Sequence, residues 1–202
     1  MQRARSQRPP AGSPPRVSGA VVLDQIRVAE AIQGKALVDR ARARMSPDAR
    51  GELDHLLPVS WCTLSTAFLM HEAIAREAGL DVNAWHRTIV RAGVERTLTT
   101  VWRLFTRILS VEGLVKRSAA IFEKSYDRGT FTARLGEGGV VEAVLDGWPD
   151  VPDFELDAIV AGLHAILAIA FKTGAAIAVE RTAGGATFRL TVVASRDAAR
   201  SA

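Results

Sequence analysis

At 202 residues, the chain has the length of one domain or of one closely joined pair of subdomains, and a hydrophobic fraction of 48% is ample for a core. Its formal net charge of +4 is accounted for by four arginines in the first 16 residues, which include no acid, so the remaining chain is formally neutral. A neutral folded body argues against nucleic acid as a partner, because phosphate binding needs clustered lysine and arginine. The single cysteine excludes an intramolecular disulfide and any multi-cysteine metal site.

The two ends of the chain differ in composition from its centre. Residues 1–16 form a basic tail with four prolines and no apolar signal segment, so we expect this tail to be disordered. The longest apolar stretch, Leu156–Phe171, is about one turn short of a membrane span and contains Asp157 and His164. We therefore expect a cytoplasmic protein with no membrane partner, and a lone cysteine fits a reducing compartment.

The first part of the folded chain has the apolar periodicity of helices, with serine, proline, aspartate or glycine at most of their ends. Gly34 is a weak point in the first of these helices, and Gly93 is a possible break in the fourth. Pro58 is expected to open the third helix, which would place Trp61 and Phe68 on one face. The predicted helical segments are 24–45, 47–57, 58–78, 82–109 and 110–126.

Residues 128–194 contain two β-hairpins with one long apolar helix between them. Segments 128–135 and 140–145 alternate in polarity around glycines 136, 138 and 139, and segments 176–180 and 187–192 flank a turn at 183–185. The sequence thus predicts an α+β fold, in which an N-terminal helical layer packs on a four-stranded antiparallel sheet and the C-terminal module runs β-β-α-β-β. We expect a single ligand-binding-like domain over residues 17–194 and a flexible C-terminal tail over 195–202.

No metal or catalytic constellation is evident. A zinc site usually places two ligands three or four residues apart on one helix face, and no pair of histidines has that spacing. His164 fits a core histidine with a hydrogen-bond partner. Cys62 could pair with His71 or His86 in a cysteine-dependent enzyme, but the sequence identifies neither an orienting group nor an oxyanion site. A small buried hydrophobic residue is the better interpretation of Cys62.

Aromatic residues concentrate in the helical part, where they could line an apolar cavity or simply form an ordinary core. Only the volume left between helices and sheet separates these two alternatives. The candidate ligand-binding residues are Trp61, Phe68, Trp85, His86, Trp102, Phe105, Phe122 and His164.

Charge is segregated along the folded chain. Residues 83–117 are mainly basic, whereas residues 127–160 carry eight acidic residues against two arginines. Surfaces of opposite sign can pair within one molecule, between protomers or with a protein partner. We expect a homodimer bound mainly through apolar hairpin and helix faces, with no part played by the tail.

One family resemblance covers roughly residues 17–194. The segments that carry it are Thr99–Leu109, Gly113–Arg117 and Tyr126–Phe131, followed by the two hairpins. Together they resemble the bacterial superfamily of haem–nitric-oxide-binding-like and vinyl-reductase-like ligand-binding domains, which includes an uncharacterised paralogous family. The resemblance implies a helical layer on an antiparallel sheet, with a pocket between them in those members that bind a ligand.

The chain departs from the haem-binding members of that group. Those members hold the haem propionates with a Tyr-x-Ser-x-Arg motif and ligate the iron through a helix histidine. Here Tyr126, the single tyrosine, is followed by Asp127, Arg128, Gly129 and Thr130, so the required serine and arginine are missing. His86 or His164 could be offered as the iron ligand, but nothing would anchor the propionates. We therefore expect no haem and no other cofactor.

These observations lead to three functional hypotheses. The first is a non-enzymatic sensory or regulatory domain that binds a small apolar ligand or a protein partner. The second is a purely structural interaction module without a ligand cavity, and a distant third is a cysteine-dependent enzyme.

Overall fold

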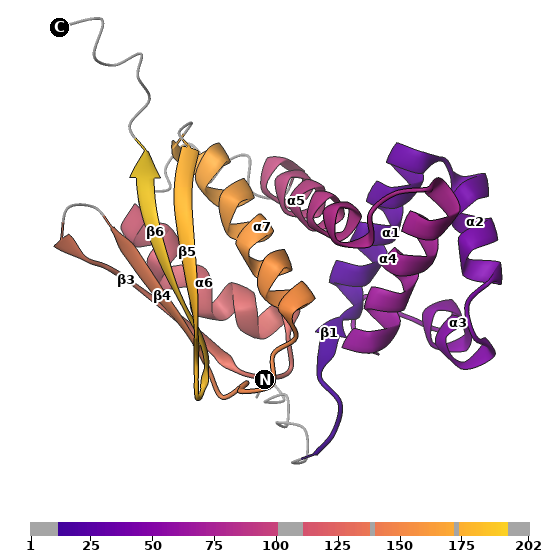
Figure 1. Ribbon diagram of the computed structural model, residues 1–202, viewed down its shortest axis with the longest axis horizontal. Helices are drawn as coiled ribbons and strands as arrows, with labels where there is room; N and C mark the ends of the chain where they lie inside the picture. Colours follow the sequence, from indigo (N-terminus) through magenta and orange to yellow (C-terminus); the bar gives the residue numbers. More distant parts are fainter. Residues whose placement is uncertain (1–11, 101–110, 138–139, 172–173, 194–202) are drawn as a thin grey trace, which may run out of the picture.

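The computed structural model describes residues 12–100, 111–137, 140–171 and 174–193 (Figure 1). Most of the helices and strands in these ranges follow the local pattern of their sequence. In chain order the elements are β1 Arg16–Ser18, α1 Gly19–Gln33, α2 Lys35–Ala43, α3 Pro47–Asp54, β2 Trp61–Thr63, α4 Leu64–Ala78, α5 Val82–Thr100, α6 Val111–Ser125, β3 Thr130–Leu135, β4 Val141–Asp146, α7 Asp153–Phe171, β5 Gly174–Thr182 and β6 Gly185–Val193.

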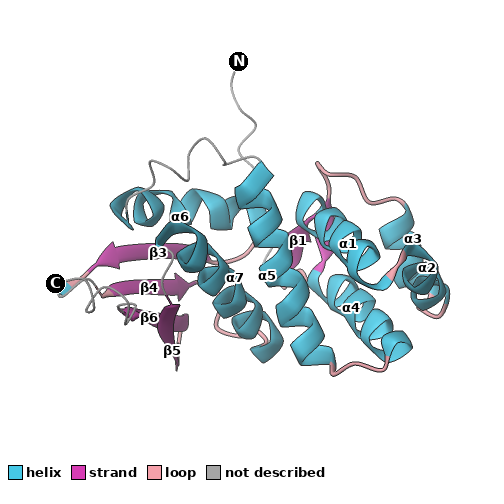
Figure 2. Cartoon of the chain, turned by 90° about the horizontal axis from the view of Figure 1, so that it is seen from above, coloured by secondary structure: helices cyan, strands magenta, loops and turns pink. Residues whose placement is uncertain are grey.

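The elements form two halves that meet along α5 and α7. The helical half comprises α1–α5 with β1 and β2, and the sheet half comprises α6, α7 and β3–β6. Seen from above, α6 and α7 cover one face of the sheet, and α7 lies between the sheet and α5 (Figure 2). Small side chains on α7 allow α5 and α7 to pack closely. A Cβ added at Gly162 of α7 would lie 3.7 Å from Val94 of α5, and Ala158 and Ala165 of α7 are also buried.

The four-stranded sheet is antiparallel throughout, with the strand order β3-β4-β6-β5. Pairing of Ala143 with Phe188 and of Leu145 with Ala186 joins the two hairpins through β4 and β6. Alternation along the strands turns one face inward, where Phe131, Leu145 and Phe188 are buried. The predicted α+β class, the antiparallel sheet and the helix covering it are confirmed.

One predicted helix start is wrong. Pro58 does not open a helix: Ser60 closes a turn by hydrogen-bonding both the backbone N–H and the carbonyl of Leu57, and Trp61 then begins β2. Helix α4 starts only at Leu64, because Thr63 caps it by accepting the N–H of Thr66. Trp61 therefore does not share a helix face with Phe68.

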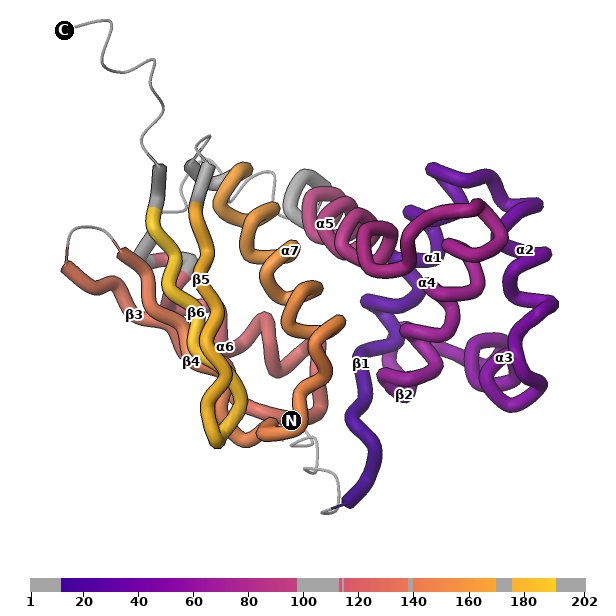
Figure 3. The backbone as a smooth tube through the Cα atoms, viewed as in Figure 1, coloured from indigo at the N-terminus to yellow at the C-terminus, as the bar shows by residue number. Residues whose placement is uncertain are grey.

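Strand β2 pairs with β1 in a small antiparallel sheet that the sequence analysis did not predict (Figure 3). Strand β1 also ties the N-terminal segment to the sheet half, through a bridge between Val17 and Tyr126. The Asp127 carboxylate accepts the backbone N–H of Arg16 at 2.9 Å and its Nε at 2.5 Å. Arg128 donates to the Ser13 carbonyl. The fold thus includes Arg16, one residue before the expected boundary.

Other local predictions have mixed outcomes. The first predicted helix is divided into α1 and α2 at Gly34, whose φ of 83° favours glycine. Helix α5, in contrast, continues through Gly93 to Thr100. The expected end of that helix, at residue 109, and Ser110, where the next helix is expected to begin, lie in residues 101–110, outside the described residues. Ser46 and Asp81 accept the backbone N–H groups expected of helix caps.

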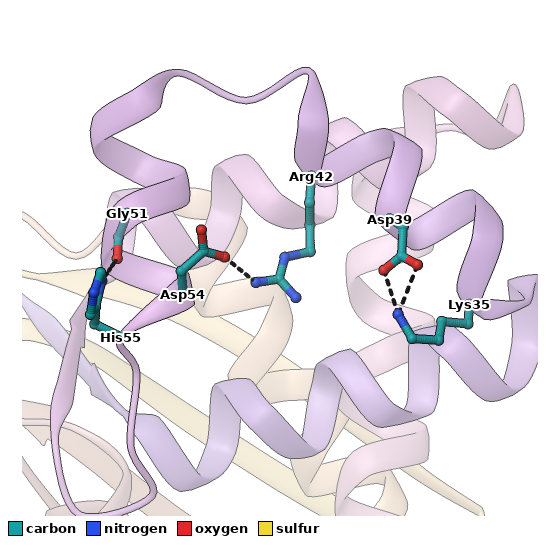
Figure 4. Close-up of polar contacts among 6 residues, drawn as sticks. All are labelled: Lys35, Asp39, Arg42, Gly51, Asp54 and His55. Carbon is teal, nitrogen blue, oxygen red and sulfur yellow. Dashed lines mark hydrogen bonds and ion pairs between the residues drawn. The ribbon is translucent and has the colours of Figure 1, made fainter.

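The outer surface of α2 and α3 carries ordinary exposed polar contacts (Figure 4). Lys35 pairs with Asp39 along α2 at 2.7 Å, and Arg42 reaches Asp54 of α3 at 2.7 Å. His55 follows α3 and its Nδ1 lies 2.8 Å from the Gly51 carbonyl. This histidine is therefore part of a helix end rather than of a binding site.

No helix in the described ranges is long and apolar enough to cross a membrane. This finding includes α7, the most apolar helix of the chain. Its exposed Asp157 pairs with Arg87 of α5 at 3.1 Å, so at least one contact between the acidic and basic segments lies within a single molecule.

Candidate functional site

A small cavity lies where the two halves meet, and we call it the seam cavity. Its volume is about 20 Å³, which is room for one water molecule. Apolar walls come from Phe68 and Leu64 of α4, Val90 of α5 and Phe154 of α7. The polar side chains that line it, contributed by α1, α4, α5, α7 and the segment after α6, are Gln25, His71, His86, Tyr126 and Glu155.

His71 is the most deeply buried of these polar side chains, with 1% of its surface exposed. It lies on the inward face of α4, one turn beyond Ala67 and one turn before Ile74. Burial, reinforced by the neighbouring His86, holds the pKa of His71 well below its ordinary value, so the ring is neutral.

The hydrogen bonds of His71 leave one ring nitrogen in the cavity without a partner in the residues that the structure describes. Its Nε2 lies 3.0 Å from Oε1 of Gln25, and in this orientation of the amide the oxygen accepts a hydrogen bond for which Nε2 carries the proton. In a neutral ring Nδ1 is then an acceptor, and it is buried without a partner among the described residues. An unpaired buried acceptor costs about 1–3 kcal/mol, so this position calls for an O–H or N–H donor.

His86 lies beside His71 on the next helix. The two rings are 4.8 Å apart, and the His86 ring also makes edge contacts with Phe68 at 5.5 Å and Phe154 at 5.9 Å. Burial lowers the pKa of His86 to about 4, although Asp157 and the Phe154 backbone oppose the shift. Both imidazoles are therefore neutral near neutral pH. Each can form hydrogen bonds through a ring nitrogen or pack against an apolar group.

Tyr126 and Glu155 form the polar wall contributed by the sheet half. The Tyr126 hydroxyl donates to the Glu155 carboxyl, which is 3% exposed in the first turn of α7. Burial raises the pKa of Glu155 to about 7, and the hydrogen bond from Tyr126 opposes this. Burial and the neighbouring carboxyl raise the pKa of Tyr126 well above its ordinary value. The pair can therefore accept or release one proton on Glu155 near neutrality.

The geometry gives no support to a catalytic cysteine. Cys62 lies in β2 with none of its surface exposed, and burial followed by the charge of Glu52 raises its pKa to about 12. A reactive thiol needs the opposite environment, with a lowered pKa and access to solvent. Among the described residues, no group of three histidine, cysteine, aspartate or glutamate side chains could hold a metal ion.

The structure separates the predicted ligand-binding residues. Phe68 and His86 line the seam cavity, and Trp85 is buried next to His86, its indole N–H finding no partner in the described part of the chain. Phe122 instead stacks with Phe131 inside the sheet half. Two others do not line the cavity, since Trp61 is half-buried in β2 and His164 is half-buried on α7. The remaining two, Trp102 and Phe105, lie outside the described residues.

Most of the lining residues were not among the predicted site residues. Those of them with a polar or aromatic side chain are Gln25, His71, Tyr126, Phe154 and Glu155. A signal for Glu155 exists in the sequence, since it continues the face of Ala158 and Gly162 at i+3 and i+7. An acid on a face of small residues indicates a buried carboxyl. His71 similarly stands on the face of Ala67 and Ile74.

Solved structures of H-NOX proteins have the same fold. The unliganded Fe(II) H-NOX protein from K. algicida aligns with a TM-score of 0.64 at 9% identity, over 89% of this chain and 98% of that chain. The S. oneidensis H-NOX protein in its Fe(II)NO ligation state aligns with a TM-score of 0.62 at 12% identity, over 87% and 99%. The oxygen complex of an oxygen-binding H-NOX domain related to soluble guanylate cyclases gives 0.60 at 13% identity, over 87% and 93%.

The TM-scores and the coverage establish the H-NOX fold for the chain. No protein-family model and no curated protein sequence matches it. Further conclusions about a ligand therefore rest on the side chains of this chain.

The described residues do not fit a haem. Ligand pockets for molecules of drug size occupy roughly 300–1,000 Å³, whereas the seam cavity measures about 20 Å³. Tyr126 is bonded to a buried carboxyl, whose negative charge when ionised would repel a propionate. Arg128 is held by the Ser13 carbonyl and lies 4.0 Å from Asp150. The tyrosine and the arginine of this segment are thus already engaged by the protein itself.

Proposed function

We propose that the chain is a non-enzymatic sensory or regulatory domain whose ligand site is the seam cavity. The observation that carries the proposal is the unpaired acceptor Nδ1 of His71, buried where two halves of the molecule meet. The H-NOX fold supports it, because two of the compared structures are those of an oxygen complex and of an Fe(II)NO ligation state. A single buried thiol also fits a bacterial cytoplasmic protein.

The ligand we propose is a small, mostly apolar molecule with one hydrogen-bond donor. Its donor would bond to Nδ1 of His71, and its apolar part would lie against Phe68 and Phe154, whose rings are 4.0 Å apart. In the closed conformation the cavity has room for one water molecule, so binding requires α4 and α7 to separate at these two rings. Such a movement would carry the signal from the site to the sheet half.

The ligand proposal is tested with two probes of matched shape. Phenol and toluene differ in a hydroxyl and a methyl group, so we expect phenol to raise the thermal midpoint more than toluene. The variant His71→Leu removes the acceptor and should abolish this difference, whereas His55→Ala at the exposed end of α3 should preserve it. Equal responses to both probes in the natural chain would contradict the proposed donor.

A second candidate function is the structural interaction module. The small volume of the seam cavity favours it, because a tightly packed core needs no ligand. If neither probe nor a wider set of small molecules shifts the thermal midpoint, this module becomes the better explanation. A cysteine-dependent enzyme would displace both candidates only if Cys62→Ala abolished a measured turnover.

A further inference from the structure

Strand β5 forms one border of the four-stranded sheet. It is nine residues long and pairs with β6 on one side only, and no other backbone bond from it appears among the described residues. The strand order therefore leaves its outer edge with a row of N–H and C=O groups that face away from the sheet. Figure 2 shows β5 at this border, beyond β6.

Over its first six residues this edge lacks the features that usually prevent strands from pairing, and its two charged residues, Glu180 and Arg181, stand near the end of the strand. Residues 174–179 include no charged residue and no proline, and the pairing with β6 is unbroken by a bulge. Ala176 and Ala178 are exposed, and Val179 is 40% exposed although its register with Phe188 places it on the inward face. The opposite border differs, since β3 has six residues and carries Arg134, which pairs with Glu142.

We propose that β5 pairs antiparallel with β5 of a second copy of this chain, about a two-fold axis through Ala178. Ala178 is the middle residue of the strand, so this register pairs the strand along its full length. The two sheets then become one eight-stranded antiparallel sheet. The inference is independent of the proposed function, because it uses no residue of the seam cavity.

Self-pairing in this register is chemically compatible along the whole edge. Ile177 faces the partner's Val179, so two apolar side chains meet on the inward face. Glu180 faces the partner's Ala176, and Arg181 faces the partner's Ala175, so no like charges are opposed. A two-fold arrangement uses each free edge once and closes the assembly, which chain-like pairing through two different edges would not.

The size of the contact sets its strength. One pair of strands is a small interface, of the kind found in weak or transient associations. We therefore expect the dimer to form and dissociate within the micromolar range of concentrations.

The test uses the full chain and places a charge at position 178, on the two-fold axis of the proposed dimer. In Ala178→Lys, two lysines would face each other across the axis, and in Ala178→Glu two carboxylates would do so, so each variant alone should sediment as a monomer. Mixing the two variants should restore the dimer, because opposite charges then face each other. The control is Thr132→Lys, an exposed position on β3 at the other border, which should leave the dimer intact.

The outcomes are decisive because position 178 is exposed and the charge-swap mixture controls for misfolding. A natural chain that is monomeric at tens of micromolar would overturn the proposal. So would a dimer that survives both single variants, or a mixture of the two variants that stays monomeric while circular dichroism shows each variant folded.

Discussion

Glu155 is a carboxyl group buried in the first turn of α7, and its proton affinity affects the stability of the fold. Its pKa is about 7 in the folded chain against 4.5 for a free carboxyl. As the pH rises through this interval, the unfolded chain releases the proton while the folded chain retains it. The contribution of Glu155 to the stability of the folded state therefore falls as the pH increases from about 4.5 to about 7.

The variant Glu155→Gln tests this dependence. It keeps a side-chain oxygen for Tyr126 but cannot ionise, so it should lack this decline. Across the interval its stability relative to that of the natural chain should therefore rise by on the order of 3 kcal/mol. Urea unfolding across this pH interval measures the difference. Glu123→Gln, at an exposed position of α6, is the matched control and should retain the decline. Parallel curves for Glu155→Gln and the natural chain would refute the prediction.

His86 affects the pH dependence of stability in the opposite direction. Its pKa is about 4 in the folded chain against an ordinary 6.5, so protonation favours the unfolded chain as the pH falls below 6.5. In His86→Phe an aromatic ring remains against Phe68 and Phe154 without a titratable group. We expect this variant to lose less stability than the natural chain between pH 6.5 and about 4, as measured by urea unfolding. An equal loss would show that other groups control the acid response.

The individual site residues were only partly predictable. Aromatic and histidine content identified Phe68 and His86, because these residue types commonly line pockets. The partnership of Tyr126 with Glu155 joins residues 29 positions apart in the chain, and no local pattern encodes it. The same holds for Gln25 and His71, which are 46 positions apart.

At the scale of elements, the hairpins and α7 could be predicted because alternation and long apolar periodicity are local signals. The error at Pro58 has a physical reason: proline suits the first turn of a helix, but it suits a turn equally well. Here Ser60 and the pairing of β2 with β1 decide between the two. Those interactions depend on the distant Val17, which a sequence window does not include.

The contact between α5 and α7 depends on the small size of Gly162. A Cβ added there would be in ordinary contact with Val94 at 3.7 Å, so Gly162→Ala should be tolerated. Gly162→Leu should force the helices apart and cost about 1–3 kcal/mol of stability. Thermal unfolding of the two variants provides the comparison. Similar midpoints for both would mean that the two helices are not closely packed at this point.

At the scale of the molecule, the N-terminal segment holds the two halves together. The Asp127 side chain is 2% exposed and binds both the backbone and the guanidinium of Arg16. Asp127→Ala should therefore destabilise the fold by about 1–3 kcal/mol and increase hydrogen exchange at residues 13–18. Asp39→Ala, which breaks an exposed pair on α2, is the control and should change neither quantity appreciably.

The absence of haem is a prediction about the whole molecule as purified. Protein from a haem-replete host should show no Soret absorption, because Tyr126 and Arg128 are already engaged by other groups of the protein. A stoichiometric Soret band that disappears in His86→Ala or His164→Ala would overturn this prediction.

The burial of Cys62 has a practical consequence for spectroscopy. A chain whose only thiol is enclosed and holds its proton up to a pKa of about 12 should not react with maleimides or nitroxide reagents under native conditions. Cysteines introduced at exposed positions such as Arg76 on α4 and Thr191 on β6 would then be the only sites labelled. Distances between two such labels would report directly whether the helical and sheet halves move apart when phenol is added.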